Sequence, residues 1–160
     1  MRKLISIIVP CYNEEEALPI FINELTEVLS TIKYEYEIIL INDGSIDQTL
    51  EVIRMLSNKY KGIRFISFSR NFGKEAAMYA GFVNSQGEYI AVMDADMQDP
   101  PTLLPQMLQI LEQEQYDSVA TRRITRIGEP VIRSWLARQF YKILNKISDA
   151  DVVDGARDFR

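Results

Sequence analysis

The sequence of 160 residues predicts an α/β protein with a mostly parallel sheet flanked by helices on both faces. Two observations support this class. Short apolar segments alternate along the chain with longer segments in which apolar residues recur every three or four positions, which is the order of a doubly wound sheet. The first two apolar segments are also rich in isoleucine at neighbouring positions, as expected of strands that are covered on both sides.

Two strand–helix units make up the first part of the chain. Strands are predicted over Leu4–Pro10 and Tyr36–Asn42, the two isoleucine-rich segments. The segments that follow them, residues 18–32 and 50–60, carry apolar residues at the three- and four-residue spacing of one helix face. Each of these two segments is therefore predicted as a helix.

The same alternation continues to about residue 121. Strands are predicted over Ile63–Ser69 and Tyr89–Met93, and helices over residues 74–83 and 103–114. A fifth strand is predicted over Ser118–Thr121. Such an order of elements requires crossover connections between parallel strands, which place helices on the faces of the sheet.

Composition narrows the chemistry. The chain has no histidine, which excludes histidine-based triads and HExxH zinc sites within it, and Cys11 as its single cysteine excludes a disulfide framework. An apolar content of 47% and a charged content of 26% are ordinary for a soluble globular protein. With no linker or repeat, one domain is predicted over residues 1–160. No signal peptide or bilayer-spanning segment is found, so this chain is expected to be soluble.

Polar side chains follow the first four predicted strands, at the point where each strand ends. Ligands of open parallel sheets collect at this edge. Turn and helix-cap residues would account for any one of these loops alone. Four polar loops on one edge favour a binding site instead. The four segments are VPCYNEEE (9–16), INDGSIDQT (41–49), SRNFGKEAA (69–77) and DADMQDPP (94–101).

The fourth loop is the most acidic. Asp94, Asp96 and Asp99 lie within six residues, directly after an apolar segment. Carboxylates this close repel one another unless a cation, hydrogen-bond donors or water hold them. Hard divalent cations prefer oxygen ligands of this kind, and Mg²⁺ takes one or two carboxylates together with substrate phosphates.

These four segments, in this order and together with DGARDFR (154–160), resemble family 2 glycosyltransferases of the GT-A fold. The resemblance covers essentially the whole chain. It is strongest to the branch that transfers a sugar from a nucleotide to a polyprenyl phosphate, as dolichol-phosphate mannosyltransferases and bactoprenol glucosyltransferases do. It implies a metal-dependent, inverting hexosyltransferase of cell-envelope glycosylation. UDP-glucose is the favoured donor, with GDP-mannose or other UDP-sugars left open.

The resemblance assigns roles in metal binding and catalysis to residues of the acidic loop. Mg²⁺ or Mn²⁺ would bridge the donor diphosphate, with Asp96 and Gln98 as its ligands in the DxD element. Asp94 would face the ribose or the metal's water shell, and with Asp96 it belongs to the catalytic set. Asp99 is interpreted as a cap of the fourth helix, and Asp47 as a cap of the second.

The resemblance also assigns the nucleotide site. Tyr12 would stack on the base, unless it is an aromatic at the edge of the core, and Lys74 would reach the nucleotide, unless it is a solvated lysine. Cys11 is expected to be a small buried residue. Asn42 departs from the family, which often has Asp-Asp at this strand tip. The nucleotide-binding residues implied are Pro10, Tyr12, Asn13, Glu14, Asp43, Lys74 and Asp94.

The acceptor site needs cations rather than a base. A phosphate monoester is largely ionised near neutral pH, since its second pKa is about 6, and so attacks without help from a histidine. Asp158 matches the carboxylate that the family places near the acceptor, where it would either orient the acceptor or serve as a base. The residues expected to hold the acceptor phosphate are Arg122, Arg123, Arg126 and Arg133.

The segment 130–147 is predicted as a basic amphipathic helix. The chain has a net charge of −5, yet this part of it carries Arg138, Lys142 and Lys146 on a face that also holds Trp135. Such a face suits an anionic membrane surface, whereas pattern alone fits a core-packed helix equally well. The resemblance favours the membrane, at whose cytoplasmic face the full-length protein would act.

Family members normally continue beyond the DFR segment into more catalytic domain and transmembrane helices, so the chain is expected to be a truncated fragment. Its partners would be a nucleotide sugar, a polyprenyl phosphate and the membrane, with no nucleic acid, and a homo-oligomer is left open. Two alternatives are a soluble glycosyltransferase with a saccharide or protein acceptor and a non-catalytic nucleotide-binding fragment.

Overall fold

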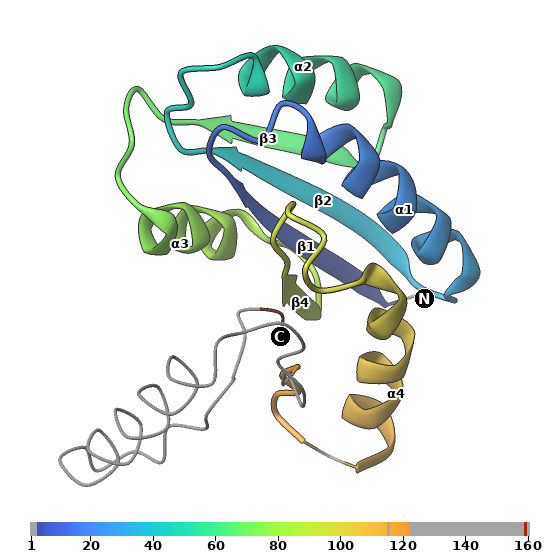
Figure 1. Cartoon of the computed structure of the whole chain (residues 1–160). Coiled ribbons are helices and arrows are strands. Elements are labelled where there is room, and N and C mark those ends of the chain that lie inside the picture. Colours follow the sequence, from blue (N-terminus) through green and yellow to red (C-terminus); the bar gives the residue numbers. More distant parts are fainter. Residues whose placement is uncertain (1–2, 115, 122–158, 160) are drawn as a thin grey trace, which may run out of the picture. The chain divides into compact units, whose positions relative to one another are not determined.

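The structure, a computed structural model, describes residues 3–114, 116–121 and 159 (Figure 1). The described strands form one parallel sheet in the order β3-β2-β1-β4, which confirms the predicted fold class. The four helices predicted between residues 18 and 114 are present, each within two residues of its expected bounds. The elements are β1 (Leu4–Cys11), α1 (Ala17–Thr31), β2 (Glu35–Asn42), α2 (Thr49–Lys59), β3 (Ile63–Ser67), α3 (Lys74–Asn84), β4 (Tyr89–Val92), the short 3₁₀ helix η1 (Pro101–Leu103) and α4 (Leu104–Glu114).

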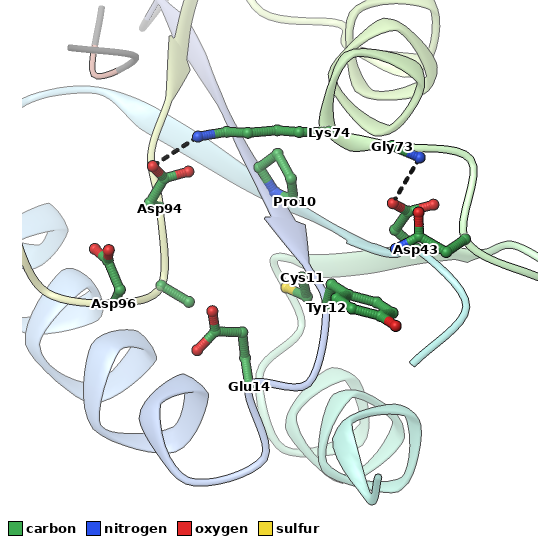
Figure 2. A pocket seen from close by; sticks show the side chains of 11 residues that line it. Pro10, Cys11, Tyr12, Glu14, Asp43, Gly73, Lys74, Asp94 and Asp96 are labelled. Atoms are coloured by element: carbon green, nitrogen blue, oxygen red, sulfur yellow. Dashed lines mark hydrogen bonds and ion pairs between the residues drawn. The ribbon is translucent and has the colours of Figure 1, made fainter. Parts of the chain in front are cut away.

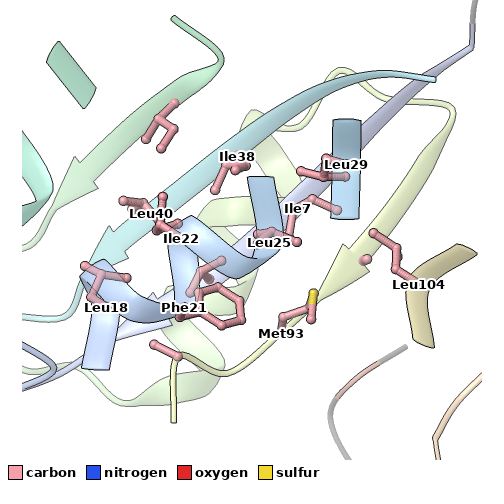
Figure 3. Close-up of a cluster of buried hydrophobic side chains, with 14 of the residues drawn as sticks. Ile7, Leu18, Phe21, Ile22, Leu25, Leu29, Ile38, Leu40, Met93 and Leu104 are labelled. Carbon is pink, nitrogen blue, oxygen red and sulfur yellow. The ribbon is translucent and has the colours of Figure 1, made fainter. Parts of the chain in front are cut away.

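Two cores lie on opposite faces of the sheet. On one face, residues of α1, α2 and α4 pack against alternate residues of the strands, with Phe21, Leu25 and Leu104 fully or almost fully buried (Figure 3). On the other face, α3 covers a smaller cluster centred on Ile8 and Ile41. Both faces of β1 and β2 are therefore buried, which is why their sequences are apolar at neighbouring positions.

Gly81 lets α3 lie close to β1. A Cβ atom at this position would stand 2.3 Å from Cγ2 of Ile8, a side chain that is itself fully buried. Any larger residue would push the helix away from the strand or force Ile8 into another rotamer. The absence of a side chain at Gly81 thus sets the distance between α3 and the sheet.

The predicted fifth strand is wrong. Residues 118–121 form no strand, and β4 pairs only with β1 within the described part of the chain. Ser118 and Ala120 are exposed and Val119 is half-buried, so the segment offers little apolar surface with which to pair at a sheet edge. An apolar pair of residues was too weak a signal for a strand.

A buried polar network ties the amino ends of the strands together. The Glu37 carboxylate of β2 accepts hydrogen bonds from Ser6 Oγ (2.6 Å), the backbone amide of Gln86 (2.7 Å) and Nε of Arg64 (3.1 Å). Ser6 Oγ in turn accepts one from the Gly87 amide at 2.8 Å. One carboxylate therefore joins three strands to the loop between α3 and β4.

The chain divides into two compact units, residues 1–119 with 159–160 and residues 120–158. Almost all of the second unit, including the helix predicted over 130–147, lies outside the described residues. The prediction of a single domain therefore stays a prediction. No helix in the described ranges is both long enough and apolar enough to cross a membrane.

Candidate functional site

A cavity of about 300 Å³ lies at the carboxyl ends of β1, β2 and β4 (Figure 2). Seven of the residues predicted to bind nucleotide or metal line it, contributed by four different loops. Their convergence follows from the parallel sheet, because such strands end at one edge. The lining residues are Pro10, Cys11, Tyr12, Glu14, Asp43, Asn71, Gly73, Lys74, Asp94, Ala95 and Asp96.

The remaining predicted residues lie elsewhere. Asn13 and Gln98 are close in sequence to the lining residues but do not line the cavity. The predicted catalytic Asp158 and the predicted acceptor-phosphate residues Arg122, Arg123, Arg126 and Arg133 lie outside the described residues. Phe159, which follows Asp158, is buried in the larger core, so this part of the DFR segment packs with the sheet.

Asn13 joins the β1–α1 loop to the β2–α2 loop. Its backbone amide donates to Ser45 Oγ at 3.1 Å, and its Oδ1 accepts from the Ile46 amide at 3.0 Å. Asn13 has a positive φ of 56°, which asparagine tolerates better than most residues. The Glu14 amide adds a bond of 2.7 Å to Thr49 Oγ1. Asn13 thus shapes the site from outside the cavity.

Asp47 supports the start of α2 from the position before the N-cap, which is Gln48 rather than the predicted Asp47. Its Oδ1 accepts from both the amide (3.0 Å) and the hydroxyl (2.6 Å) of Thr49. Its Oδ2 accepts from the Glu15 amide at 3.4 Å, and the Glu15 carboxylate accepts from the Gln48 amide at 2.8 Å. These reciprocal bonds satisfy amides at the start of the helix that have no partner within it.

Asn42 has a structural role at the tip of β2. Its Nδ2 donates to Ser67 Oγ of β3 at 2.9 Å, and its Oδ1 accepts from the Ser45 amide at 3.1 Å. The amide thus acts as donor and acceptor at once. An ionised aspartate at this position could only accept.

Asp43 is buried, with 3% of its surface exposed, and holds the loop between β3 and α3. Its Oδ1 accepts from the Phe72 amide at 2.7 Å and its Oδ2 from the Gly73 amide at 3.0 Å. Gly44 allows this loop to lie close to β2, because a Cβ atom at Gly44 would stand 2.2 Å from the carbonyl carbon of Arg70. The sequence showed Asp43 at a strand tip but not its bonds to this loop.

Three carboxylates point into the cavity from two sides, Glu14 from the loop after β1 and Asp94 and Asp96 from the loop after β4 (Figure 2). Lys74 Nζ lies 2.7 Å from Asp94 Oδ2, while Asp96 Oδ1 accepts from the Gln98 amide at 3.0 Å. Burial, followed by the negative charges of Asp96, Asp94 and Asp47, raises the pKa of Glu14. The cavity therefore disfavours additional negative charge unless a cation enters.

The residues present fit a metal ion that takes a few ligands from the protein and the rest from a phosphate. The described residues hold no group of three or more acidic, histidine or cysteine side chains arranged around one point, so a site built from protein side chains alone is not found there. The exposed Asp96 and the nearby Gln98 offer oxygen atoms from one loop. This is the sparse protein contribution that Mg²⁺ commonly receives when phosphates complete its shell.

Cys11 is a buried structural residue, as expected. Its Sγ donates to the carbonyl of Val9 at 3.3 Å and it is 1% exposed. Burial raises the pKa of this thiol far above its ordinary value, so the thiolate that metal binding or nucleophilic attack requires is disfavoured. The thiol therefore contributes packing to the floor of the cavity.

The sequence model described as "Glycosyl transferase family 2" matches residues 6–160. The chain belongs to this family. It is 46% identical over 157 residues to the putative glycosyltransferase CsbB of Bacillus subtilis, covering 98% of this chain and 47% of that protein. It is 39% identical over 156 residues to the prophage bactoprenol glucosyl transferase homolog of Escherichia coli, covering 98% of this chain and 51% of that protein.

Solved structures confirm the GT-A type of fold. The mannosyltransferase PcManGT of Pyrobaculum calidifontis, in complex with GDP-Man and Mn²⁺, is 20% identical, with a TM-score of 0.64 over 90% of this chain and 39% of that one. S. aureus TarS 1–349 in complex with UDP is 23% identical, with a TM-score of 0.61 over 82% of this chain and 38% of that one. The chain spans about half the length of the curated relatives that it matches.

Proposed function

We propose that the chain is the donor-binding part of a metal-dependent, inverting glycosyltransferase that moves a hexose from a nucleotide diphosphate sugar to a polyprenyl phosphate. One observation carries the proposal: Glu14, Asp94 and Asp96 face one cavity at the carboxyl edge of the sheet, which Asp43 and Lys74 complete. The names of the relatives favour glucose and bactoprenol as the sugar and the acceptor. UDP-glucose is accordingly the favoured donor.

In this proposal the acidic loop and Lys74 serve the diphosphate. Asp96 and Gln98 hold the divalent cation, Mg²⁺ or Mn²⁺, and Asp94 lies beside them toward the ribose. The bound cation offsets the charge that develops on the leaving diphosphate. Lys74 adds a second positive charge beside the same group, while Tyr12 and Asp43 serve the nucleoside.

The acceptor side completes the reaction. An oxygen of the lipid phosphate forms a bond to the anomeric carbon as the bond from that carbon to the nucleotide diphosphate breaks, which inverts the configuration in a single displacement. The phosphate is already an anion, so no base is needed. Asp158 and the four arginines named above would orient it, and the basic segment 130–147 would bring the protein to the cytoplasmic face of an anionic membrane.

Titration calorimetry of the chain with UDP, GDP, UDP-glucose and GDP-mannose, with and without Mn²⁺, tests the donor and the metal together. We expect UDP and UDP-glucose to bind only when Mn²⁺ is present. Asp96→Asn should abolish the binding of UDP and UDP-glucose that depends on Mn²⁺, because an amide is a weaker ligand for a hard cation than a carboxylate. Glu51→Gln, a matched loss of one carboxylate on α2, should bind as the parent does.

Two results would contradict the proposal. Equal binding of UDP and Mn²⁺ by Asp96→Asn and the parent would remove the metal assignment, and absence of nucleotide binding in the parent would remove the donor site. Binding without any Mn²⁺-dependent hydrolysis of the donor would favour a second candidate, a nucleotide-binding part without catalysis.

A further inference from the structure

We propose that Met97 is a positioning residue for the divalent cation, because it fixes the turn of the acidic loop on which Asp96 and Gln98 lie. Met97 stands between these two proposed ligands in the sequence and does not itself line the cavity. The inference rests on the proposed donor site and deepens it, since it assigns the arrangement of the two ligands to a residue outside the cavity.

The side chains of the acidic loop alternate between the interior and the solvent. Ala95 (2% exposed) and Asp99 (8% exposed) are buried and Met97 is half-buried, whereas Asp96 and Gln98 between them are exposed. The Met97 side chain packs against the larger core. Three buried or half-buried residues therefore hold the loop, and the central one has a proposed metal ligand on either side.

The backbone of Met97 adopts a conformation that costs free energy. Its φ is 59°, in the left-handed region where the Cβ atom of an L residue comes close to the following carbonyl oxygen. Glycine has no Cβ atom and avoids this cost. Among the non-glycine residues of the described chain, Met97 shares a positive φ only with Asn13. A methionine at this position indicates that its side chain supplies something that glycine would not.

The turn at Met97 keeps the two proposed ligands together. The backbone amide of Gln98 donates to Asp96 Oδ1 at 3.0 Å, a bond across two residues that requires a turn between them. This bond orients the Asp96 carboxylate, which lines the cavity with Glu14 and Asp94 (Figure 2). Because the packed Met97 side chain holds the turn in place, less conformational freedom remains to be lost when a cation binds.

Replacement by alanine or glycine separates the side chain of Met97 from its backbone. Both changes remove the apolar contact with the core, but alanine keeps the strain of the positive φ, whereas glycine relieves the strain and frees the turn. If Met97 serves only the fold, stability and cation affinity should follow the same order in the two variants. If it positions the ligands, the glycine variant should be the more stable of the two and yet bind the cation more weakly.

Urea denaturation without divalent cations, and calorimetry with UDP plus Mn²⁺, should be carried out on the parent, Met97→Leu, Met97→Ala and Met97→Gly. We expect Met97→Leu to bind within about twofold of the parent, since leucine and methionine fill similar volumes. Mn²⁺-dependent UDP binding should weaken about threefold in Met97→Ala and about tenfold in Met97→Gly. Of these two variants, Met97→Gly should nevertheless unfold at the higher urea concentration.

Two controls separate positioning from a general loss of packing. Met78→Ala removes a half-buried methionine of α3 that packs against the smaller core, and it should lower stability without changing Mn²⁺-dependent UDP binding. Uridine, followed by NMR titration, should bind to the parent and to every Met97 variant alike, because it carries no diphosphate for the cation to bridge.

Three results would overturn the inference while the proposed donor site stands. The first is Mn²⁺-dependent UDP binding by Met97→Gly that is as tight as that of Met97→Ala, or tighter. The second is a loss in Met97→Leu as large as that in Met97→Gly, and the third is equal weakening of uridine and UDP. A parent that does not bind UDP in the presence of Mn²⁺ would overturn the donor site together with the inference.

Discussion

Glu37, at the amino ends of the parallel strands, has surroundings different from those of the three carboxylates that share the cavity at the carboxyl ends. At the amino ends, Glu37 is enclosed by donors from β1, β3 and the α3–β4 loop, including the Arg64 guanidinium (Nη2 to Oε2, 2.5 Å). At the carboxyl ends, Glu14, Asp94 and Asp96 face a shared cavity together. Glu37 thus completes the fold, whereas the three carboxylates of the cavity lie close to one another, with the Lys74 ammonium beside Asp94.

The pKa values follow the same division. Burial by itself raises the pKa of Glu37, but hydrogen bonds from Ser6, the Gln86 amide and Arg64 outweigh it, so the pKa is lowered overall. Burial also raises the pKa of Glu14, and there the neighbouring charges are negative and add to the effect. The pKa shifts of Glu37 and Glu14 therefore differ in direction, because hydrogen-bond donors surround Glu37 whereas negative charges surround Glu14.

Glu37→Ala should have the largest effect on stability. It leaves Ser6 and the Gln86 amide without their buried acceptor and removes the partner of Arg64, so we expect a loss of about 2–3 kcal/mol in the free energy of unfolding. The estimate is kept below that of a fully buried ion pair because Arg64 is half exposed. Urea denaturation measures it. The exposed Glu35→Ala on the same strand is the control, and an equal loss in both would remove the special role of Glu37.

Low pH should weaken the same network, because protonation of Glu37 removes its charge. Because the folded pKa of Glu37 lies below its ordinary value of 4.5, its contribution to stability is complete above that value. It is lost as pH falls through the folded pKa, since the unfolded chain takes up the proton first. Thermal denaturation of the parent and Glu37→Gln should therefore show a smaller difference in stability at low pH than at pH 7. A constant difference would contradict the lowered pKa.

Asp96→Asn should have the smallest effect. Its carboxylate is exposed and lies near other negative charges, so its loss should change the free energy of unfolding by less than about 0.5 kcal/mol, or raise it. The same urea denaturation, without divalent cations, provides the measurement. A loss as large as that of Glu37→Ala would mean that the carboxyl-end acids are structural, and the division between the two ends would fail.

Most of the fold could be predicted from the sequence because burial on both faces leaves a strong pattern. β1 and β2 each contain three isoleucines at closely spaced positions, and the helices repeat apolar residues at the spacing of one face. The segment 118–121 failed because four residues with one half-buried valine carry too little of that pattern. Local sequence is informative where many apolar positions agree.

The polar networks could not be predicted in the same way. Glu37 and Gln86 are 49 positions apart, and they meet only after three strands pair. The loop residues of the site were found because they follow strands whose ends coincide, but the partner of each carboxylate depends on loop geometry. Asp43 was predicted at the correct edge of the sheet, while its bonds to Phe72 and Gly73 required the structure.

The bonds between the β1–α1 and β2–α2 loops bear on the design of new donor specificities. Asn13 exchanges bonds with Ser45 and Ile46, and Glu15 does so with Asp47 and Gln48. A replacement loop that lacks these partners would leave amides of the other loop to bond with water, at little cost where they are exposed, as those of Asn13, Ile46 and Gln48 are. Because the two loops hold each other through these bonds, a design that changes the donor should exchange them together.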